Sequence, residues 1–96
     1  MKFLICSDGT QSAETAIHLG GLLAAPLKAE TTLLGIAETS QDEQPLRDAL
    51  YKQAQLLQGH GVSPVIVVQS GEPVRQIVDQ TSKTSYDLVV IGARWI

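Results

Sequence analysis

Short apolar runs alternate with longer amphipathic stretches along the whole chain. The apolar runs have the length of strands and lie at residues 3–6, 31–37, 65–68 and 88–91. The last two are continuously apolar, which is typical of strands buried on both faces of a parallel sheet. We therefore expect four strands in one sheet.

Three stretches between these runs have the period of an amphipathic helix, at about residues 13–25, 41–58 and 73–83. Pro26 is expected to end the first helix, since a proline removes a backbone donor. The pair Gly20-Gly21 is costly inside a helix, at roughly 1 kcal/mol per glycine relative to alanine. We interpret it as a point of close packing between helix and sheet.

The second helix is predicted to begin with a capping box formed by Ser40 and Glu43 and to end at Gly59. Its apolar stripe is expected to consist of Leu46, Ala49, Leu50, Gln53, Ala54 and Leu57.

Pro73 is a favourable first residue for the third helix, and Glu72 before it suits the positive end of the helix dipole. Val74, Ile77 and Val78 are expected to face inward.

Strands and helices thus alternate from one end of the chain to the other. Each connection is long enough for a right-handed crossover between parallel strands. The pattern predicts an α/β fold, and the length of 96 residues predicts a single domain over residues 1–96.

The composition of the chain argues against several classes of protein. Seven basic and ten acidic residues give a net charge of −3 without a Lys/Arg cluster, which argues against nucleic-acid binding. No apolar run approaches the roughly 20 residues that span a bilayer. The single cysteine, Cys6, excludes an internal disulfide and is expected to be an inert buried thiol. These features predict a cytoplasmic protein without a membrane partner.

The sequence offers little catalytic chemistry. His18 and His60 have no cysteine, histidine or carboxylate at ligand spacing, so no metal site is predicted. No nucleophile–base pair or Walker motif is visible, so we do not expect an enzyme. A phosphoacceptor receiver domain needs an aspartate after the third strand, where Gln69, Ser70 and Gly71 stand instead.

Three stretches together resemble the universal stress protein family. They are "FLICSDGTQSAETAI", "TTLLGIAE" and "SGEPVRQIVDQTSKTSYDLVVIGAR", and the match covers essentially the whole chain. The resemblance implies a Rossmann-like, adenine nucleotide alpha hydrolase-like open parallel sheet in the order 3-2-1-4-5. Here we expect the order 3-2-1-4, with the fifth strand and fourth helix absent. The first two helices would cover one face and the third helix the other.

The resemblance also implies a ligand site at the carboxyl ends of the central strands. Nucleotide-binding members carry Gly-x2-Gly-x9-Gly-Ser/Thr after the fourth strand, where glycines let the backbone wrap the phosphates. Gly92 can be the first glycine, but Trp95 stands at the second and the rest is absent. The implied site is an adenosine half-site that binds ATP or AMP weakly. Its residues are Ser7, Asp8, Gly9, Ile36, Ala37, Ile91 and Gly92.

Several of these polar residues also have a purely structural interpretation. Asp8 can bind a ligand or cap backbone amides in a strand-to-helix turn. Thr10 and Ser12 are expected to be helix caps rather than phosphate ligands, and Arg94 a solvated tail residue.

The end of the chain predicts association. The uncharged strand at 88–91 would be an edge, and an apolar edge is a template for pairing with another chain. We expect a homodimer through this strand, with Trp95 and Ile96 in the contact. The leading hypothesis is thus a non-enzymatic universal-stress-type protein, dimeric and acting in stress response or regulation. The alternatives are an ATP-hydrolysing switch whose phosphate loop comes from elsewhere, and a scaffold that binds another protein and no ligand.

Overall fold

The computed structural model describes residues 1–93 of the chain. Within that part it contains four strands and three helices, with one-turn 3-10 helices at Gln11–Ala13 and Ser40–Asp42. The strands are β1 (Lys2–Ser7), β2 (Glu30–Ala37), β3 (Val65–Ser70) and β4 (Leu88–Gly92), and the helices are α1 (Glu14–Leu27), α2 (Glu43–Gly59) and α3 (Pro73–Lys83).

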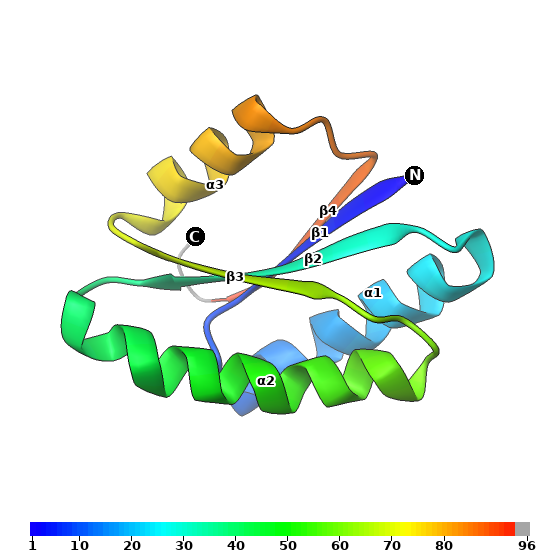
Figure 1. The fold of residues 1–96 in the computed structure, drawn as a ribbon, viewed down its shortest axis with the longest axis horizontal. Helices are drawn as coiled ribbons and strands as arrows, with labels where there is room; N and C mark the ends of the chain where they lie inside the picture. The colour runs from blue at the N-terminus through cyan, green and yellow to red at the C-terminus, as the bar shows by residue number, and fades with distance from the viewer. Residues whose placement is uncertain (94–96) are drawn as a thin grey trace.

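The strands form one parallel sheet in the order β3-β2-β1-β4 (Figure 1). Helices α1 and α2 lie together on one face of the sheet and α3 lies on the other. The predicted α/β class, strand order and distribution of helices are therefore confirmed. Among the helices of residues 1–93, none is long and apolar enough to cross a membrane.

Alternate residues of β1 supply two separate cores. Phe3 and Ile5 point toward α1 and α2, whereas Leu4 and Cys6 point toward α3. All four are almost completely buried, as expected for a central strand of a covered parallel sheet. Burial raises the pKa of the Cys6 thiol to about 12, so the thiol stays protonated at neutral pH. The expectation of a buried cysteine is confirmed.

Two predicted helix boundaries are wrong. Helix α1 continues through Pro26 and ends at Leu27, because a proline in the last turn removes one hydrogen bond without blocking the residue after it. The turn is closed at Lys28, which has a left-handed backbone (φ 51°) and donates its N–H to Ala24 and Ala25 carbonyls.

The predicted capping box is also absent. A 3-10 turn over Ser40–Asp42 precedes α2, so Ser40 is not the N-cap residue. Glu43 instead accepts a hydrogen bond from the Ser70 hydroxyl at the end of β3. The glutamate therefore joins the start of α2 to the edge of the sheet.

The glycine pair of α1 makes two different contacts. A Cβ at Gly20 would collide with the Ile5 side chain, which confirms the predicted close approach of helix and sheet. A Cβ at Gly21 would lie only 2.8 Å from the His60 ring, so this glycine makes room for a residue at the end of α2.

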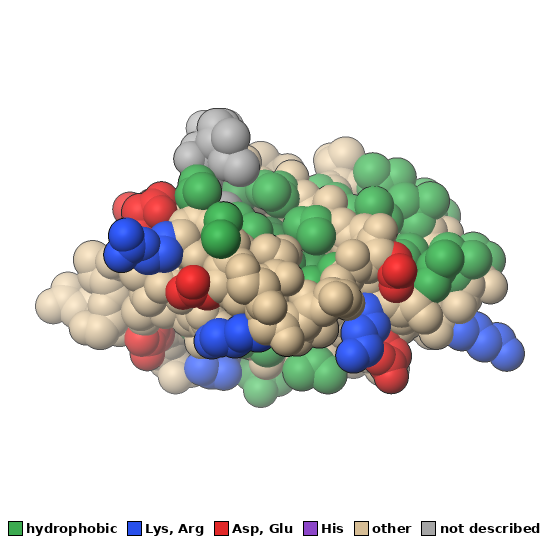
Figure 2. All heavy atoms as spheres, turned by 90° about the horizontal axis from the view of Figure 1, so that it is seen from above, with side chains coloured by type: hydrophobic (Ala, Val, Ile, Leu, Met, Phe, Trp, Pro, Cys, Tyr) green, Lys and Arg blue, Asp and Glu red, His purple; other side chains and the backbone are tan. Residues whose placement is uncertain are grey.

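Helix α3 covers its face incompletely. Ile77 is buried as predicted, but Val74 and Val78 are 43% and 54% exposed, so the prediction that they face inward is wrong. Val89 and Ile91 pair with Leu4 and Cys6 of β1, which places them on the same side of the sheet as α3. They too are partly exposed, and Figure 2 shows hydrophobic side chains gathering on this side of the molecule.

Candidate functional site

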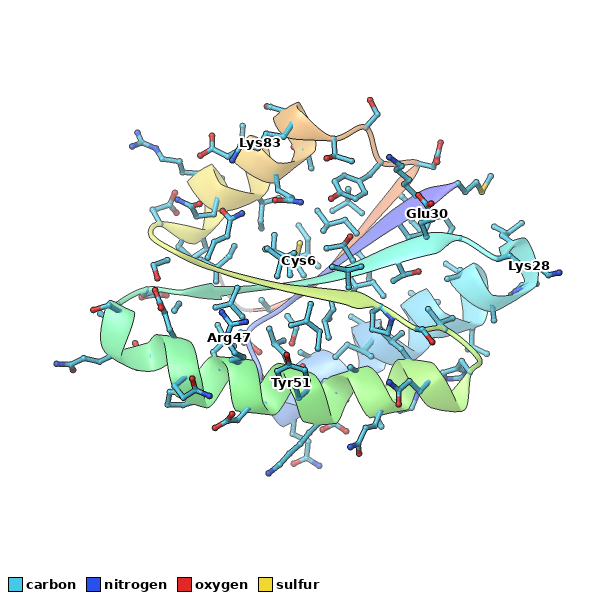
Figure 3. All side chains as sticks on the ribbon, viewed as in Figure 1. Cys6, Lys28, Glu30, Arg47, Tyr51 and Lys83 are labelled. Atoms are coloured by element: carbon cyan, nitrogen blue, oxygen red, sulfur yellow. The ribbon has the colours of Figure 1, made fainter. Side chains whose placement is uncertain are left out.

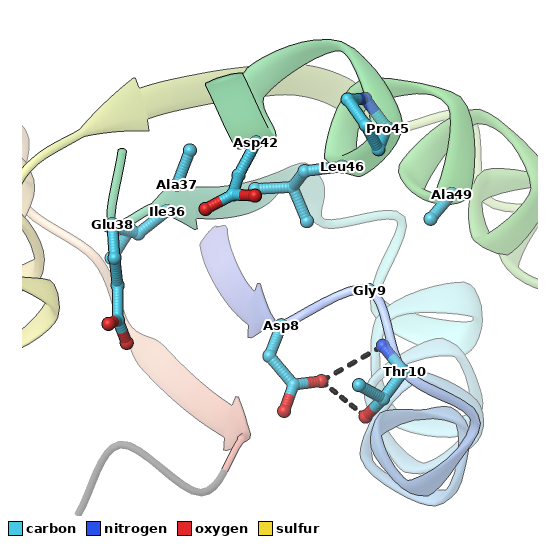
Figure 4. A pocket seen from close by; sticks show the side chains of 10 residues that line it. All are labelled: Asp8, Gly9, Thr10, Ile36, Ala37, Glu38, Asp42, Pro45, Leu46 and Ala49. Carbon is cyan, nitrogen blue, oxygen red and sulfur yellow. Dashed lines mark hydrogen bonds between the residues drawn. The ribbon is translucent and has the colours of Figure 1, made fainter. Parts of the chain in front are cut away.

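A crevice opens at the carboxyl ends of β1 and β2, beside the start of α2 (Figure 4). Its volume is about 520 Å³. The described residues that line it are Asp8, Gly9, Thr10, Ile36, Ala37, Glu38, Asp42, Pro45, Leu46 and Ala49. All four strands are parallel, but the strand order reverses at β1, which has β2 on one side and β4 on the other. Open α/β sheets bind ligands beyond the carboxyl ends of the strands at such a point.

Asp8 is the central polar residue of this crevice. One carboxylate oxygen, Oδ1, accepts hydrogen bonds from the Thr10 amide at 3.0 Å and the Thr10 hydroxyl at 2.5 Å (Figure 4). The other oxygen, Oδ2, makes no hydrogen bond to the described residues. Asp8 therefore both shapes the turn and keeps an acceptor for a ligand.

The turn itself depends on Gly9. Its φ of +79° lies in the left-handed region, and a Cβ there would lie 2.8 Å from Leu46 Cδ1. A side chain at position 9 would thus strain the backbone and push α2 away from the loop.

Ser7 acts beneath the crevice rather than in it. Its hydroxyl is fully buried, donates to Gln53 Oε1 at 2.6 Å and accepts from the Gly9 amide at 3.0 Å. Gln53 in turn donates to the Thr10 carbonyl at 2.9 Å. The Ser7 side chain is thus used inside the protein, where it holds the loop that carries Asp8.

Gln53 was missed as a site-supporting residue because its spacing fits the apolar stripe of α2. It is 95% buried, with both ends of its amide bonded to the loop after β1. A glutamine at an otherwise apolar stripe position is the signal that could have indicated this role.

The wall opposite the loop is apolar. Ile36 and Ala37 at the end of β2 are both buried, as a covered strand requires, and they meet Pro45, Leu46 and Ala49 of α2 along the lining. A flat apolar group can contact this wall.

Two acidic residues, Glu38 and Asp42, complete the lining together with Asp8. Both are exposed, and both were missed because "ETSQDE" reads only as the polar start of a helix. Since none of the described lining residues is Lys or Arg, the crevice disfavours dense negative charge.

Ile91 and Gly92 lie outside this crevice. They line a separate groove of about 430 Å³ along α1, with Ser12, Thr15, Ala16, Leu19, Val90 and Ala93. Gly92 nevertheless pairs with Ser7 in the sheet, one residue from Asp8. The structure thus brings Asp8, Gly9, Ile36 and Ala37 together and leaves Ile91 and Gly92 beside them.

The cap predictions have mixed outcomes. Thr10 is the N-cap residue of the 3-10 turn at Gln11–Ala13, but its side chain makes no capping bond, because its hydroxyl donates to Asp8 and lies 2.9 Å from the Ser12 hydroxyl. Ser12 lies inside that turn and is not its cap residue. Glu72 does cap α3, accepting from the Val74 and Arg75 amides at 3.1 and 2.8 Å. The predictions for Arg94, Trp95 and Ile96 fall outside the described residues.

One contact was invisible in the sequence. His18 of α1 and His60 at the end of α2 lie with Nδ1 and Nε2 3.0 Å apart. Sequence spacing gives no hint of it, since 42 residues separate the two histidines.

Comparisons with known proteins agree on the family and the fold. The model of the family described as "Universal stress protein family" matches residues 1–95. No curated protein sequence is similar enough to the chain to count as a match.

Several solved structures share the fold. A universal stress protein from Archaeoglobus fulgidus in complex with dAMP has a TM-score of 0.86 and 16% identity, over 100% of this chain and 83% of that one. Another structure of a universal stress protein from the same organism has a TM-score of 0.85 and 17% identity, over 98% of this chain and 77% of that one. A universal stress protein in complex with cAMP has a TM-score of 0.79 and 19% identity, over 92% of this chain and 69% of that one.

Proposed function

The chain belongs to the universal stress protein family, and from that premise we propose that it is a regulatory binding protein for an adenosine monophosphate. The proposed site is the crevice at the carboxyl ends of β1 and β2. The observation that carries the proposal is a crevice lined both by apolar Ile36 and Leu46 and by Asp8, whose Oδ2 makes no hydrogen bond to the described residues. The purine would lie along Ile36 and Leu46, and the carboxylate would accept from a ribose hydroxyl or the adenine amino group.

Two similar structures support the choice of ligand. They were solved with dAMP and with cAMP, which share an adenine, a sugar and a single phosphate. Their low identity to this chain limits the comparison to the fold, so the assignment here rests on the crevice itself.

The acidic lining of the crevice favours a nucleoside monophosphate over ATP. Asp8, Glu38 and Asp42 all line the crevice and disfavour additional phosphate charge. We therefore expect affinity to fall from AMP to ATP in buffer without divalent cations.

The first prediction concerns Asp8. Asp8→Asn keeps an oxygen for the two bonds from Thr10 but replaces the free oxygen with a donor. Because a hydrogen bond to a charged group is worth roughly 1.5–3 kcal/mol, AMP affinity should fall roughly 10- to 100-fold. Calorimetric titration with AMP, dAMP and ATP measures this.

Asp48→Asn is the matched control, since Asp48 is an exposed aspartate of α2 outside the crevice lining. It should bind AMP like the wild type. Equal affinity of Asp8→Asn and wild type would contradict the assignment. Tighter binding of ATP than AMP would favour a switch whose phosphate loop is supplied elsewhere.

We propose binding rather than catalysis, with a role in stress response or regulation. Among the described lining residues there is no serine, cysteine or histidine to form a nucleophile–base pair, which supports this choice.

Self-association is the second candidate function. In the described sheet β4 is an edge strand, and Leu88–Gly92 carries no charge. Helix α3, on the same side of the sheet as Val89 and Ile91, also exposes the apolar side chains of Val74 and Val78. Since a second copy offers the same uncharged edge, two copies can pair across a two-fold axis. Trp95 and Ile96, also predicted in this contact, lie outside the described residues.

A lysine on each edge of the sheet tests the dimer. Val89→Lys on β4 should shift the protein from dimer to monomer in size-exclusion chromatography with light scattering. Val65→Lys, on the opposite edge strand β3, is the matched control because Val65 is 64% exposed. A wild-type monomer at micromolar concentration, or a dimer that survives Val89→Lys, would contradict the proposal, and a dimer lost only with Val65→Lys would move the contact to β3.

A further inference from the structure

The chain contains two histidines, and the fold brings both to one place. His18 Nδ1 and His60 Nε2 are 3.0 Å apart, and the rings meet edge to face with their centroids 5.3 Å apart. His18 is exposed and His60 is half-buried, so solvent reaches the pair.

The backbone holds His60 firmly in this position. Its amide donates to the Leu57 carbonyl at 2.9 Å, and Gly61 follows with a left-handed φ of +84° to end the helix. The ring rests on α1 at Gly21, where a Cβ would lie 2.8 Å from ring atom Cδ2 and 3.0 Å from Cγ. The absence of a side chain at residue 21 thus creates the space in which the ring approaches His18.

The contact between the rings places one proton between His18 Nδ1 and His60 Nε2, and the tautomer decides which nitrogen donates. A cation that replaces the proton would be bound by both nitrogens. Zinc–nitrogen bonds of about 2.0 to 2.1 Å, at angles of about 90° to 109°, place two ligand nitrogens roughly 2.9 to 3.4 Å apart. The observed 3.0 Å already lies in that range.

We propose that His18 and His60 form a two-histidine site for a divalent first-row transition metal such as zinc. Imidazole nitrogen suits zinc, copper and nickel, whereas magnesium and calcium require oxygen ligands. Within residues 1–93 no group of three or more His, Cys, Asp or Glu side chains could hold a metal. Water therefore fills the remaining coordination positions, and the affinity is lower than that of a four-ligand structural site.

The metal would link α1 to the end of α2. Helix α2 also carries Gln53, whose amide donates to the Thr10 carbonyl in the loop after β1. An ion that binds the native state and not the unfolded state stabilises the fold. A bound ion should therefore raise the unfolding temperature without occupying the nucleotide crevice.

The test uses thermal unfolding of the full chain with zinc chloride in a non-coordinating buffer. At a zinc concentration about ten times the dissociation constant, the wild-type midpoint should rise by roughly 5 to 10 °C. His18→Gln and His60→Gln should each lose this shift. Gly21→Ala keeps both histidines but displaces the His60 ring, so it should reduce the shift as well.

Imidazole nitrogen resonances separate this site from generic metal binding. Zinc should shift Nδ1 of His18 and Nε2 of His60 together, saturating at one ion per chain with no change in molecular mass. An equal thermal shift in either glutamine variant would overturn the proposal. So would resonances that do not move, or a mass that rises with zinc because the ion bridges two chains.

Discussion

At the scale of single residues, a few side chains hold the loop after β1 in place, and Asp8 of that loop has two roles. Asp8 shapes its turn with one oxygen and offers the other, while Ser7 and Gln53 fix the loop from beneath. The family resemblance implied Asp8, Gly9, Ile36 and Ala37, which directly follow or end strands. Sequence reasoning missed Gln53, Glu38 and Asp42, whose roles depend on where α2 lies relative to β1.

Gln53→Leu tests the support of the loop. The variant keeps the apolar packing but leaves the buried Ser7 hydroxyl without its acceptor, and it removes one of the two donors to the Thr10 carbonyl. An unsatisfied buried group costs about 1–3 kcal/mol, so urea denaturation should show a loss of that size. AMP affinity should fall as well, since Asp8 would no longer be held in place.

Gln55→Leu, an exposed position on the same helix, is the matched control. It should change the free energy of unfolding by no more than about 0.5 kcal/mol. Equal stability of the two variants would show that the Gln53 amide does not hold the loop.

At the scale of elements, the strands were predictable and the helix ends were not. The four apolar runs became β1 to β4. The prediction that the continuously apolar runs at 65–68 and 88–91 are buried on both faces is wrong, because β3 and β4 are the edges of the described sheet and are only partly buried. The end of a helix can shift when a single hydrogen bond is gained or lost. Helix α1 therefore continues past Pro26, and a 3-10 turn stands where a capping box was predicted before Glu43. The exposed Val74 and Val78 of α3 show that an apolar stripe does not guarantee a partner.

Close packing of α1 on the sheet gives a test at this scale. Gly→Ala inside a helix usually stabilises by up to about 1 kcal/mol. At position 20 the new Cβ would collide with Ile5, so Gly20→Ala should instead lower the free energy of unfolding, by about 1–3 kcal/mol.

Gly59→Ala is the control, because a Cβ there meets nothing within 4 Å. It should be neutral or slightly stabilising in the same urea titration. Stabilisation by Gly20→Ala equal to that of Gly59→Ala would mean that the helix moves freely away from Ile5.

At the scale of the whole molecule, the proposed activities occupy different places on one sheet. The crevice lies at the carboxyl ends of the central strands, the histidine pair joins α1 to the end of α2, and β4 is the apolar edge of the described sheet. The arrangement of these strands and helices is seen in Figures 1 and 3, where Cys6 lies between the sheet and α3. The alternation of strands and helices predicts a parallel sheet, and the family resemblance implies its strand order. The histidine pair could not be predicted, because contact across 42 residues depends on helix packing and on Gly21.

The most direct test of the central claim is amide chemical-shift mapping of the nitrogen-15 labelled chain during titration with AMP. The largest changes should fall on Asp8, Gly9, Thr10 and Glu38, around the crevice. These changes should be much smaller in Asp8→Asn at the same AMP concentration. Changes confined to Ser12, Thr15 and Gly92 in the groove along α1, or no change at millimolar AMP, would contradict the account.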